Sequence, residues 1–168
     1  MADAIGGAYL QADLTAESSR AALITNAHAR WGRLDVLVNN AGISGVIPHH
    51  DLDAATPEIW HALYEVNGVA PYRLGAAAAP QMQGGCVVNI SSHAGVRPKG
   101  ASIPYAASKA ALNHVTRLLA LAPGIRVNAV APGLVDTPLM TDWTEARRLW
   151  DRARPCAGVL RRRTSPQS

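Results

Sequence analysis

The sequence lacks the features that mark membrane and secreted proteins. No apolar run reaches the eighteen or so residues that cross a bilayer. The first fifteen positions contain Asp3 and Asp13 but no lysine or arginine, which argues against a signal peptide. The two cysteines, Cys86 and Cys156, form no Cys-x-x-Cys pair. We therefore expect a cytoplasmic protein with reduced thiols and no membrane partner.

Signals for a metal or nucleic-acid site are also missing. The adjacent His49 and His50 lack the spacing and the partner residues of metal ligands, so we expect no metal site. The net charge of +4 lies at the carboxyl end, because residues 141–168 hold seven basic and three acidic side chains. No aromatic residues interleave with these arginines, so a solvated charge run is favoured over a nucleic-acid site. We interpret residues 156–168 as a basic, disordered tail.

What the chain does contain is a regular alternation of strand and helix patterns. With 168 residues, 48% of them apolar, it is long enough for one domain with a real core. The patterns predict strands at 8–12, 34–39, 86–90 and 126–130, and helices at 15–30, 56–74 and 103–121. Thr15 and Thr56 are the expected helix caps. This order predicts an α/β fold with a parallel sheet covered by helices on both faces.

Tyr105 and Lys109 lie four positions apart in the helix expected at 103–121, with Ser92 thirteen positions upstream. Residues at this spacing share one helix face. A lysine ammonium beside a phenol could lower the pKa of the phenol from about 10 towards 7, which requires roughly 4 kcal/mol of preference for phenolate. The Tyr-x-x-x-Lys pattern alone is weak, and an exposed helix pair is its alternative interpretation.

A second motif, Asn39-Asn40-Ala41-Gly42, follows the strand expected at 34–39. Ligands bind at this end of the strands in open α/β sheets. Together the motifs give the chain a resemblance, over residues 8–155, to the short-chain dehydrogenase/reductase family. The further matching motifs are Asp13-Leu14-Thr15, Val66-Asn67, Asn89-Ile90-Ser91-Ser92 and Pro132-Gly133-Leu134-Val135-Asp136-Thr137.

The resemblance implies a partial doubly wound, Rossmann-like sheet in residues 1–155 that lacks its first βαβ unit and its last strand. No Gly-x-Gly-x-x-Gly turn follows a predicted strand, and Gly6-Gly7 precede one. In the doubly wound order, strand 8–12 would be separated from strand 34–39 by strands that this chain does not contain. We expect strand 8–12 either to lie next to strand 34–39 or to be poorly ordered, and strand 34–39 to expose an apolar edge.

The resemblance also assigns catalytic roles. Tyr105 would be the general acid or base, Lys109 would hold the nicotinamide ribose and favour the tyrosinate, and Ser92 would donate a hydrogen bond to the substrate oxygen. Asn67, at a kink beside Gly68, would support a water chain to Lys109. Of the adjacent Ser91 and Ser92, we choose Ser92 because its thirteen-residue interval to Tyr105 fits the family. Ser91 is then a plain strand-end residue. The alternative for Asn67 is that it is simply a polar residue on a helix.

The implied cofactor is NAD or NADP, and the sequence does not distinguish between them. Asp13 and Leu14 would contact the adenine, although an Asp before a helix is usually a cap. A plain turn after the strand at 126–130 is the alternative for Pro132 and Gly133. The other residues implied along the cofactor are Asn39, Ala41, Gly42, Tyr105, Lys109, Pro132, Gly133 and Thr137.

The function that follows is an NAD(P)-dependent oxidoreductase acting on a small alcohol or carbonyl substrate. The alternative is a catalytically inert, truncated relative that persists as a fragment or as a partner subunit. Intact Ser92, Tyr105 and Lys109 favour the enzyme, whereas the missing phosphate loop favours inertness. We expect weak or undetectable activity from the isolated chain. The helices beginning at Thr56 and Ile103 resemble those that form family dimers, so a homo-oligomer is plausible.

Overall fold

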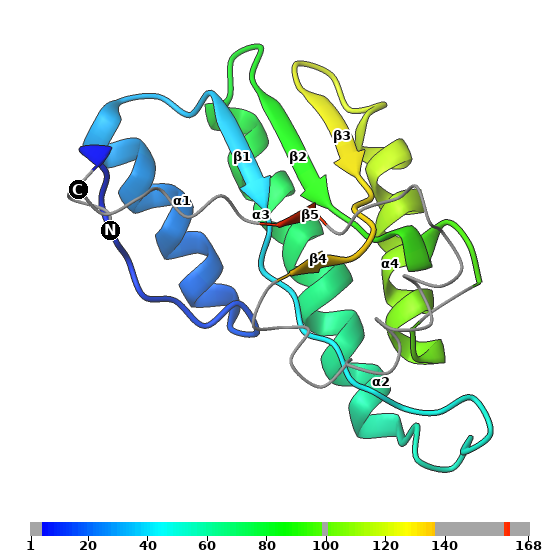
Figure 1. The fold of residues 1–168 in the computed structure, drawn as a ribbon. Helices are drawn as coiled ribbons and strands as arrows, with labels where there is room; N and C mark the ends of the chain where they lie inside the picture. The colour runs from blue at the N-terminus through cyan, green and yellow to red at the C-terminus, as the bar shows by residue number, and fades with distance from the viewer. Residues whose placement is uncertain (1–4, 99–100, 137–159, 162–168) are drawn as a thin grey trace, which may run out of the picture.

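The computed structural model of the protein describes residues 5–98, 101–136 and 160–161. Its centre is a parallel sheet of three strands in the order β1-β2-β3 (Figure 1). The strands are β1 (Val36–Asn39), β2 (Cys86–Ile90) and β3 (Arg126–Val130), in close agreement with three of the predicted strands. Val38 pairs with Val88, and Val88 with Asn128, so the three carboxyl ends lie at one edge of the sheet.

Each of the sheet's connections is helical, as the alternating pattern predicts. α1 (Glu17–Trp31) precedes β1, and α4 (Ile103–Leu119) connects β2 to β3. Between β1 and β2 the chain forms α2 (Pro57–Tyr64), the π-helical turn η2 (Glu65–Val69), α3 (Ala70–Ala78) and the short 3₁₀ turn η3 (Ala79–Gln81). A second 3₁₀ turn, η4 (His93–Gly95), follows β2 directly. The α/β class expected from the sequence is confirmed.

The sheet is covered differently from the prediction, because the described helices pack on one face. Leu37, Val87 and Val127 share that face and are buried or half-buried, and in Figure 1 the strands lie in front of α3. The opposite face carries Val36, Val38 and Val130, whose exposed fractions are 57%, 53% and 51%. Parallel sheets normally bury both faces. β1 lies at an edge of this sheet, as expected for strand 34–39, but its exposed valines lie on the open face of the sheet and not along that edge.

The core lies between the sheet and the helices. Burial of these aliphatic side chains is the main stabilising term available to a domain of this size. Leucines and alanines from α1, α3 and the end of α4 pack around the core. Its buried members are Ile24, Leu74, Ala78, Met82, Val87, Ile125 and Val127.

The strand predicted at 8–12 is wrong. Residues 8–12 form no strand and do not pair with β1, and Tyr9 and Leu10 are 80% and 48% exposed. In Figure 1 this segment runs outside α1, away from the three strands. The predicted cap at Thr15 is also wrong: the N-cap of α1 is Ala16, and the Thr15 amide and hydroxyl both donate to the Asp13 carboxylate. A five-residue segment with no neighbouring strand has no partner for the hydrogen bonds of a β-ladder.

A second, parallel pairing joins β4 (Val135–Asp136) to β5 (Leu160–Arg161). β5 falls within the segment 156–168 that we expected to be a disordered tail. The other residues of that segment lie outside the described residues. Of the helices that the structure describes, none is long and apolar enough to cross a bilayer.

Candidate active site

Ser92, Tyr105 and Lys109 come from two neighbouring elements at the carboxyl end of β2. Ser92 is the N-cap of η4, where its Oγ accepts a hydrogen bond from the Ala94 amide at 3.2 Å. Tyr105 and Lys109 lie on the first two turns of α4, which begins after Ser102 with Pro104 in its first turn. A proline is favoured there because the first-turn amides have no helical acceptor. The Ser92 hydroxyl lies close enough to the Tyr105 phenol to lower the pKa of that phenol by hydrogen bonding.

Lys109 is a buried amine. Its residue is 5% exposed, and its Nζ donates a hydrogen bond to the Ile90 carbonyl oxygen at 2.8 Å, at the end of β2. Burial lowers the pKa of Lys109 to about 8, because the charged form loses its hydration. At pH 7 the side chain therefore still carries its proton, but it releases that proton at a pH about 2.5 below that of an exposed lysine.

The pKa of Tyr105 differs from the sequence-based expectation. Burial raises it above its ordinary value of 10.0, and the hydrogen bond from Ser92 opposes this by stabilising the phenolate. Lys109 directs its Nζ at the Ile90 carbonyl, and desolvation of the phenol outweighs the hydrogen bond. Tyr105 therefore retains its proton at neutral pH, as Lys109 does.

Asn67 occupies the π-helical turn η2 and is fully buried. Its amide nitrogen donates to Ile43 O and to Ser108 Oγ, both at 3.0 Å, and its Oδ1 accepts the Ile43 amide at 3.0 Å. Ser108 in turn donates to Tyr105 O at 2.8 Å. The irregular turn expected beside Gly68 is present, and such turns often occur at functional sites. Asn67 thus ties the loop after β1 to the helix of Tyr105 and Lys109.

Gly42 lies at the meeting point of these groups. A Cβ atom at this position would lie 3.0 Å from Asn67 Oδ1 and 3.4 Å from Lys109 Nζ. The absence of a side chain therefore lets the β1 loop approach both groups closely. The structure brings together five of the predicted residues, namely Gly42, Asn67, Ser92, Tyr105 and Lys109.

Asn39 points towards the helices and belongs to a buried polar chain. Its amide donates to Asn89 Oδ1 at 2.8 Å and to Pro71 O at 3.3 Å. The Asn89 amide donates to Thr116 Oγ1 at 2.9 Å, so the chain crosses β1, β2 and α4. The Asn39 Oδ1 is buried with no protein hydrogen-bond partner. The Asn39 side chain therefore links β1 to β2, while its own Oδ1 accepts no hydrogen bond from the described residues.

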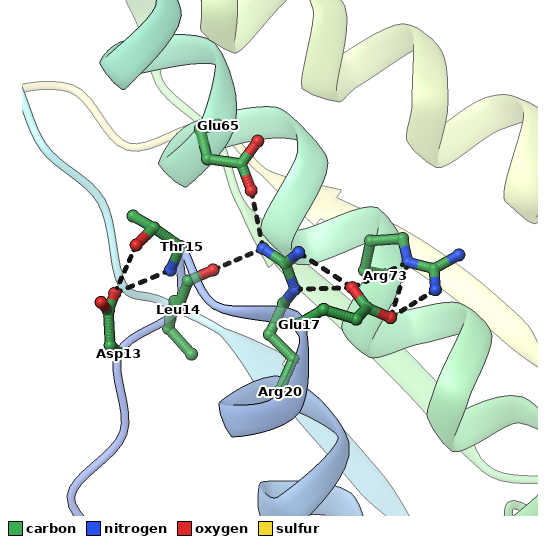
Figure 2. Close-up of polar contacts among 7 residues, drawn as sticks. All are labelled: Asp13, Leu14, Thr15, Glu17, Arg20, Glu65 and Arg73. Carbon is green, nitrogen blue, oxygen red and sulfur yellow. Dashed lines mark hydrogen bonds and ion pairs between the residues drawn. The ribbon is translucent and has the colours of Figure 1, made fainter.

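Asp13 and Leu14 lie just before α1, where Arg20 holds the backbone (Figure 2). Arg20 is 6% exposed and donates to Leu14 O at 2.6 Å, to Glu65 Oε1 at 2.7 Å and to Glu17. The Glu17 carboxylate also pairs with Arg73 on α3. The two arginines hold the pKa of Glu17 at about 2. This network connects the segment expected at the adenine to the helical turn that carries Asn67.

A cavity of about 300 Å³ opens between α1, β1 and α3. Leu14, Asn39 and Ala41 line it, together with apolar residues of α1 and α3. Ser92, Tyr105 and Lys109 do not. The loop after β1 joins the two places, because Ala41 lines the cavity and its neighbour Gly42 lies against Lys109.

The remaining predicted residues follow β3. The Pro132 carbonyl accepts the His93 amide at 2.9 Å, so Pro132 lies beside the turn that carries Ser92. Gly133 is exposed at the next position. Thr137 lies outside the described residues.

Four residues that support the site were not singled out for these roles from the sequence. Ser91 Oγ donates to Lys109 O at 3.3 Å, which fits its position at the strand end, and Ser108 lies inside the Tyr-x-x-x-Lys motif. Gly95 packs on the backbone of α4, and Arg20 holds Leu14. The serines are visible as small polar residues next to motif positions. No local pattern marks Gly95, whose contacts on α4 lie 14 and 15 positions away. None marks the pairing of Arg20 with Glu65 either, since 45 positions separate them.

The site can be tested for its fit to a nicotinamide cofactor. The buried Lys109 ammonium, the Tyr105 phenol and the close approach at Gly42 suit a ribose bearing hydroxyls and a flat ring. The diphosphate has no comparable cradle among the described residues, because none of β1, β2 and β3 is followed by a turn with several glycines. The fit is good at the reactive end.

Comparison with known proteins identifies the family of the chain. The family model described as short chain dehydrogenase matches residues 3–148. The chain belongs to the short-chain dehydrogenase family. It is 48% identical over 142 residues to ketoacyl reductase 2 of the granaticin polyketide synthase of Streptomyces violaceoruber, and 40% identical over 161 residues to cis-4-hydroxycyclohexanecarboxylate dehydrogenase of Sinomonas cyclohexanicum. These matches cover 82% and 92% of this chain but 55% and 64% of the relatives.

Solved structures of family members superpose on the short-chain dehydrogenase chain described here. A short-chain type dehydrogenase/reductase from Mycobacterium marinum gives a TM-score of 0.84 at 28% identity, covering 95% of this chain and 67% of that one. A gluconate 5-dehydrogenase from Burkholderia cenocepacia, solved in complex with NADP and tartrate, gives 0.79 at 30% identity, covering 89% and 61%. The Rossmann-like class is thereby confirmed, and the chain spans about half to two-thirds of the length of the relatives it matches.

Proposed function

We propose that the chain carries the catalytic residues of an NAD(P)-dependent oxidoreductase that reduces a small carbonyl compound to an alcohol, or runs the reverse reaction. The observation that carries this proposal is the convergence of Ser92, Tyr105 and Lys109 at the carboxyl end of β2, with Asn67 and Gly42 packed against them. The relatives named as dehydrogenases and a ketoacyl reductase support it.

Tyr105 is the proton donor in this proposal. When a carbonyl is reduced, its carbon receives a hydride and its oxygen must receive a proton. A phenol whose pKa is raised by burial retains its proton at pH 7, and so can supply it to the oxygen as charge develops there. The Ser92 hydroxyl stabilises the resulting phenolate by hydrogen bonding. In the alcohol-oxidising direction the same phenolate would take the proton back.

Lys109 and Asn67 hold this arrangement in place. The nicotinamide cofactor would supply or accept the hydride, with its ribose against Lys109 and Tyr105 and its ring beside Gly42 and the Pro132 turn. Asn39, Ala41, Asp13 and Leu14 would extend the contact towards the adenine. Thr137 and the choice between NAD and NADP belong to the same proposal, and so does assembly into a homo-oligomer, which light scattering of the purified chain would detect.

The test is cofactor binding observed at Lys109. The chain has two lysines, Lys99 and Lys109, so ¹³C-lysine labelling gives two side-chain signals that Lys109→Arg assigns. We expect NADP⁺ or NAD⁺ to shift the Lys109 Cε signal in a saturable way and AMP to leave it unchanged, because AMP lacks the nicotinamide ribose. A Lys109 signal that stays unchanged with millimolar NADP⁺ and NAD⁺ contradicts the proposal.

The second candidate is a catalytically inert relative that acts as a fragment or as a partner subunit. One observation favours it, namely the exposed apolar face of the sheet at Val36, Val38 and Val130. An exposed apolar surface of this kind favours association. The Lys109 Cε signal distinguishes the two candidates, since an inert fragment needs no affinity for the nicotinamide cofactor and its signal would not shift.

A further inference from the structure

We propose that Gly95 is a positioning residue for this site. Because it has no side chain, the turn that carries Ser92 can lie directly on the backbone of α4 at Lys109, and this contact sets the separation between Ser92 and Tyr105. The inference rests on the proposed function for its meaning, since it concerns the same proton-transfer group. Its test, however, needs neither cofactor nor hydride transfer.

The close approach is measured by the space a side chain would need. A Cβ atom at Gly95 would lie 2.6 Å from Lys109 C, 2.8 Å from Ala110 N and 2.9 Å from Lys109 Cβ. Non-bonded heavy atoms prefer separations of about 3.5 to 4.0 Å. The atoms in the way belong to the helix backbone and to the root of a side chain, so they cannot rotate aside. A methyl group here must push the turn and α4 apart, by roughly 0.5 to 1 Å.

Two hydrogen bonds within the turn and one to α4 fix its position, so a displacement at Gly95 is carried to Ser92. Gly95 N donates to Ser92 O at 3.0 Å, and Ala94 N donates to Ser92 Oγ at 3.2 Å. On the α4 side, Asn113 Nδ2 donates to Gly95 O at 3.0 Å. The turn therefore moves as a unit and takes the Ser92 hydroxyl with it.

Tyr105 lies on the other side of this contact, one turn before Lys109 on α4. A hydrogen bond between side chains weakens steeply as its length and angle leave the preferred range. Separating the turn from α4 therefore weakens the bond between Ser92 and Tyr105. The distance between the hydroxyl and the phenol is thus set at Gly95, three residues from one partner and ten from the other.

The test measures the Tyr105 phenol with and without each residue. The chain has four tyrosines, so ¹³Cζ-tyrosine labelling gives four signals, and Tyr105→Phe identifies one of them. The signal is followed from pH 7 to 12 in the wild type, Ser92→Ala, Gly95→Ala and the double variant. We expect each single change to raise the Tyr105 pKa by about 0.5 to 1, the equivalent of one hydrogen bond, and the double variant to raise it no further.

Gly75→Ala is the matched control, because a Cβ there meets Leu119 Cδ1 at an ordinary 3.7 Å. It should leave the Tyr105 signal unchanged. Asn113→Ala provides a second variant that adds no atoms but releases Gly95 O, and it should raise the Tyr105 pKa in the same direction. This variant keeps the test decisive if Gly95→Ala does not fold.

Three results would overturn the inference. One is a Gly95→Ala or Asn113→Ala protein that is less stable but has an unchanged Tyr105 pKa, which is the result of a merely structural role. Another is an effect of Gly95→Ala that adds fully to that of Ser92→Ala. The third is an equal effect from Gly75→Ala. Failure of nicotinamide binding at Lys109 would refute the proposed function but leave this result unaffected, so the two failures are distinguishable.

Discussion

Arg20 and Glu65 are joined by a hydrogen-bonded ion pair of 2.7 Å although 45 positions separate them in the chain. The pair connects the start of α1 to the π-helical turn of Asn67 (Figure 2). Arg20 also binds Leu14 O, so one buried guanidinium fixes the segment proposed to contact the adenine relative to the turn that carries Asn67.

Replacement of this arginine tests the importance of the connection. Arg20→Met leaves the Leu14 carbonyl and the Glu65 carboxylate without their donor, and we expect the free energy of unfolding to fall by about 2 to 3 kcal/mol in urea denaturation. Arg73→Met is the control, since Arg73 also binds Glu17 but is exposed, and its loss should cost under about 1 kcal/mol. Equal losses in the two variants would contradict a special role for Arg20.

Gly42→Ala tests the close approach of the β1 loop to Lys109. The added Cβ would lie 3.0 Å from Asn67 Oδ1, which is bound to the Ile43 amide and is not free to move. We expect a loss of about 1 to 3 kcal/mol in stability and a shifted Lys109 Cε signal at pH 7. Gly45→Ala, where a Cβ meets no atom within 4 Å, should change neither. An unaltered Lys109 signal in Gly42→Ala would show that the loop is not packed against the amine.

Contacts such as these two cannot be predicted from the sequence, whereas much of the secondary structure can. The spacing of apolar residues predicts β1, β2, β3 and most helix boundaries, because each depends on residues close in the chain. The strand predicted at 8–12 fails because a strand needs a neighbour, and no sequence pattern within five residues reveals whether one is present. The helices of the described residues also lie on one face of the sheet, where we expected helices on both faces. Alternation of strands and helices indicates that a sheet is parallel, but it does not reveal which face of the sheet each helix covers.

The site shows the same division. Tyr105, Lys109 and Ser92 could be predicted together because the motifs have fixed spacings. The raised pKa of Tyr105 could not be predicted, since it depends on how deeply the phenol is buried in the folded chain and on where Lys109 directs its amine. Arg20 and Gly95 owe their roles to partners that only the folded chain brings near.

The pH dependence of stability tests the burial of Lys109. The pKa of this group is about 8 in the folded chain against an ordinary 10.5, so between these pH values the unfolded chain retains a proton that the folded chain has released. The free energy of unfolding therefore rises with pH in this range, by up to about 3 kcal/mol from this group. Above pH 10 the raised pKa of Tyr105 acts in the opposite direction, because the unfolded phenol ionises first.

Lys109→Met should remove the rise between pH 8 and 10 in urea denaturation followed at several pH values. Lys99→Met changes the net charge by the same amount and should preserve the rise. A rise that persists in Lys109→Met would show that another group causes it.

Ser91→Ala and Ser92→Ala separate support from chemistry. Ser91 is 5% exposed and donates to Lys109 O, so its loss should lower stability by about 1 kcal/mol and leave the Tyr105 pKa unchanged. Ser92→Ala should raise the Tyr105 pKa, with a smaller cost in stability because Ser92 is more exposed. Urea denaturation and the ¹³Cζ signal of Tyr105 measure the two effects. If Ser91→Ala instead raises the Tyr105 pKa and Ser92→Ala leaves it unchanged, Ser91 is the partner of the phenol and the prediction is wrong.

The most direct measurement of the central claim is transfer of deuterium from [4-²H]NADPH or [4-²H]NADH to a panel of small ketones, detected in the alcohol product by mass spectrometry with the protein in excess. The panel uses each cofactor labelled on either face of the nicotinamide ring. The account predicts a slow transfer that falls at least 100-fold in Tyr105→Phe and is retained in Tyr72→Phe. No transfer above that of heat-denatured protein, or an equal rate in Tyr105→Phe, would contradict it.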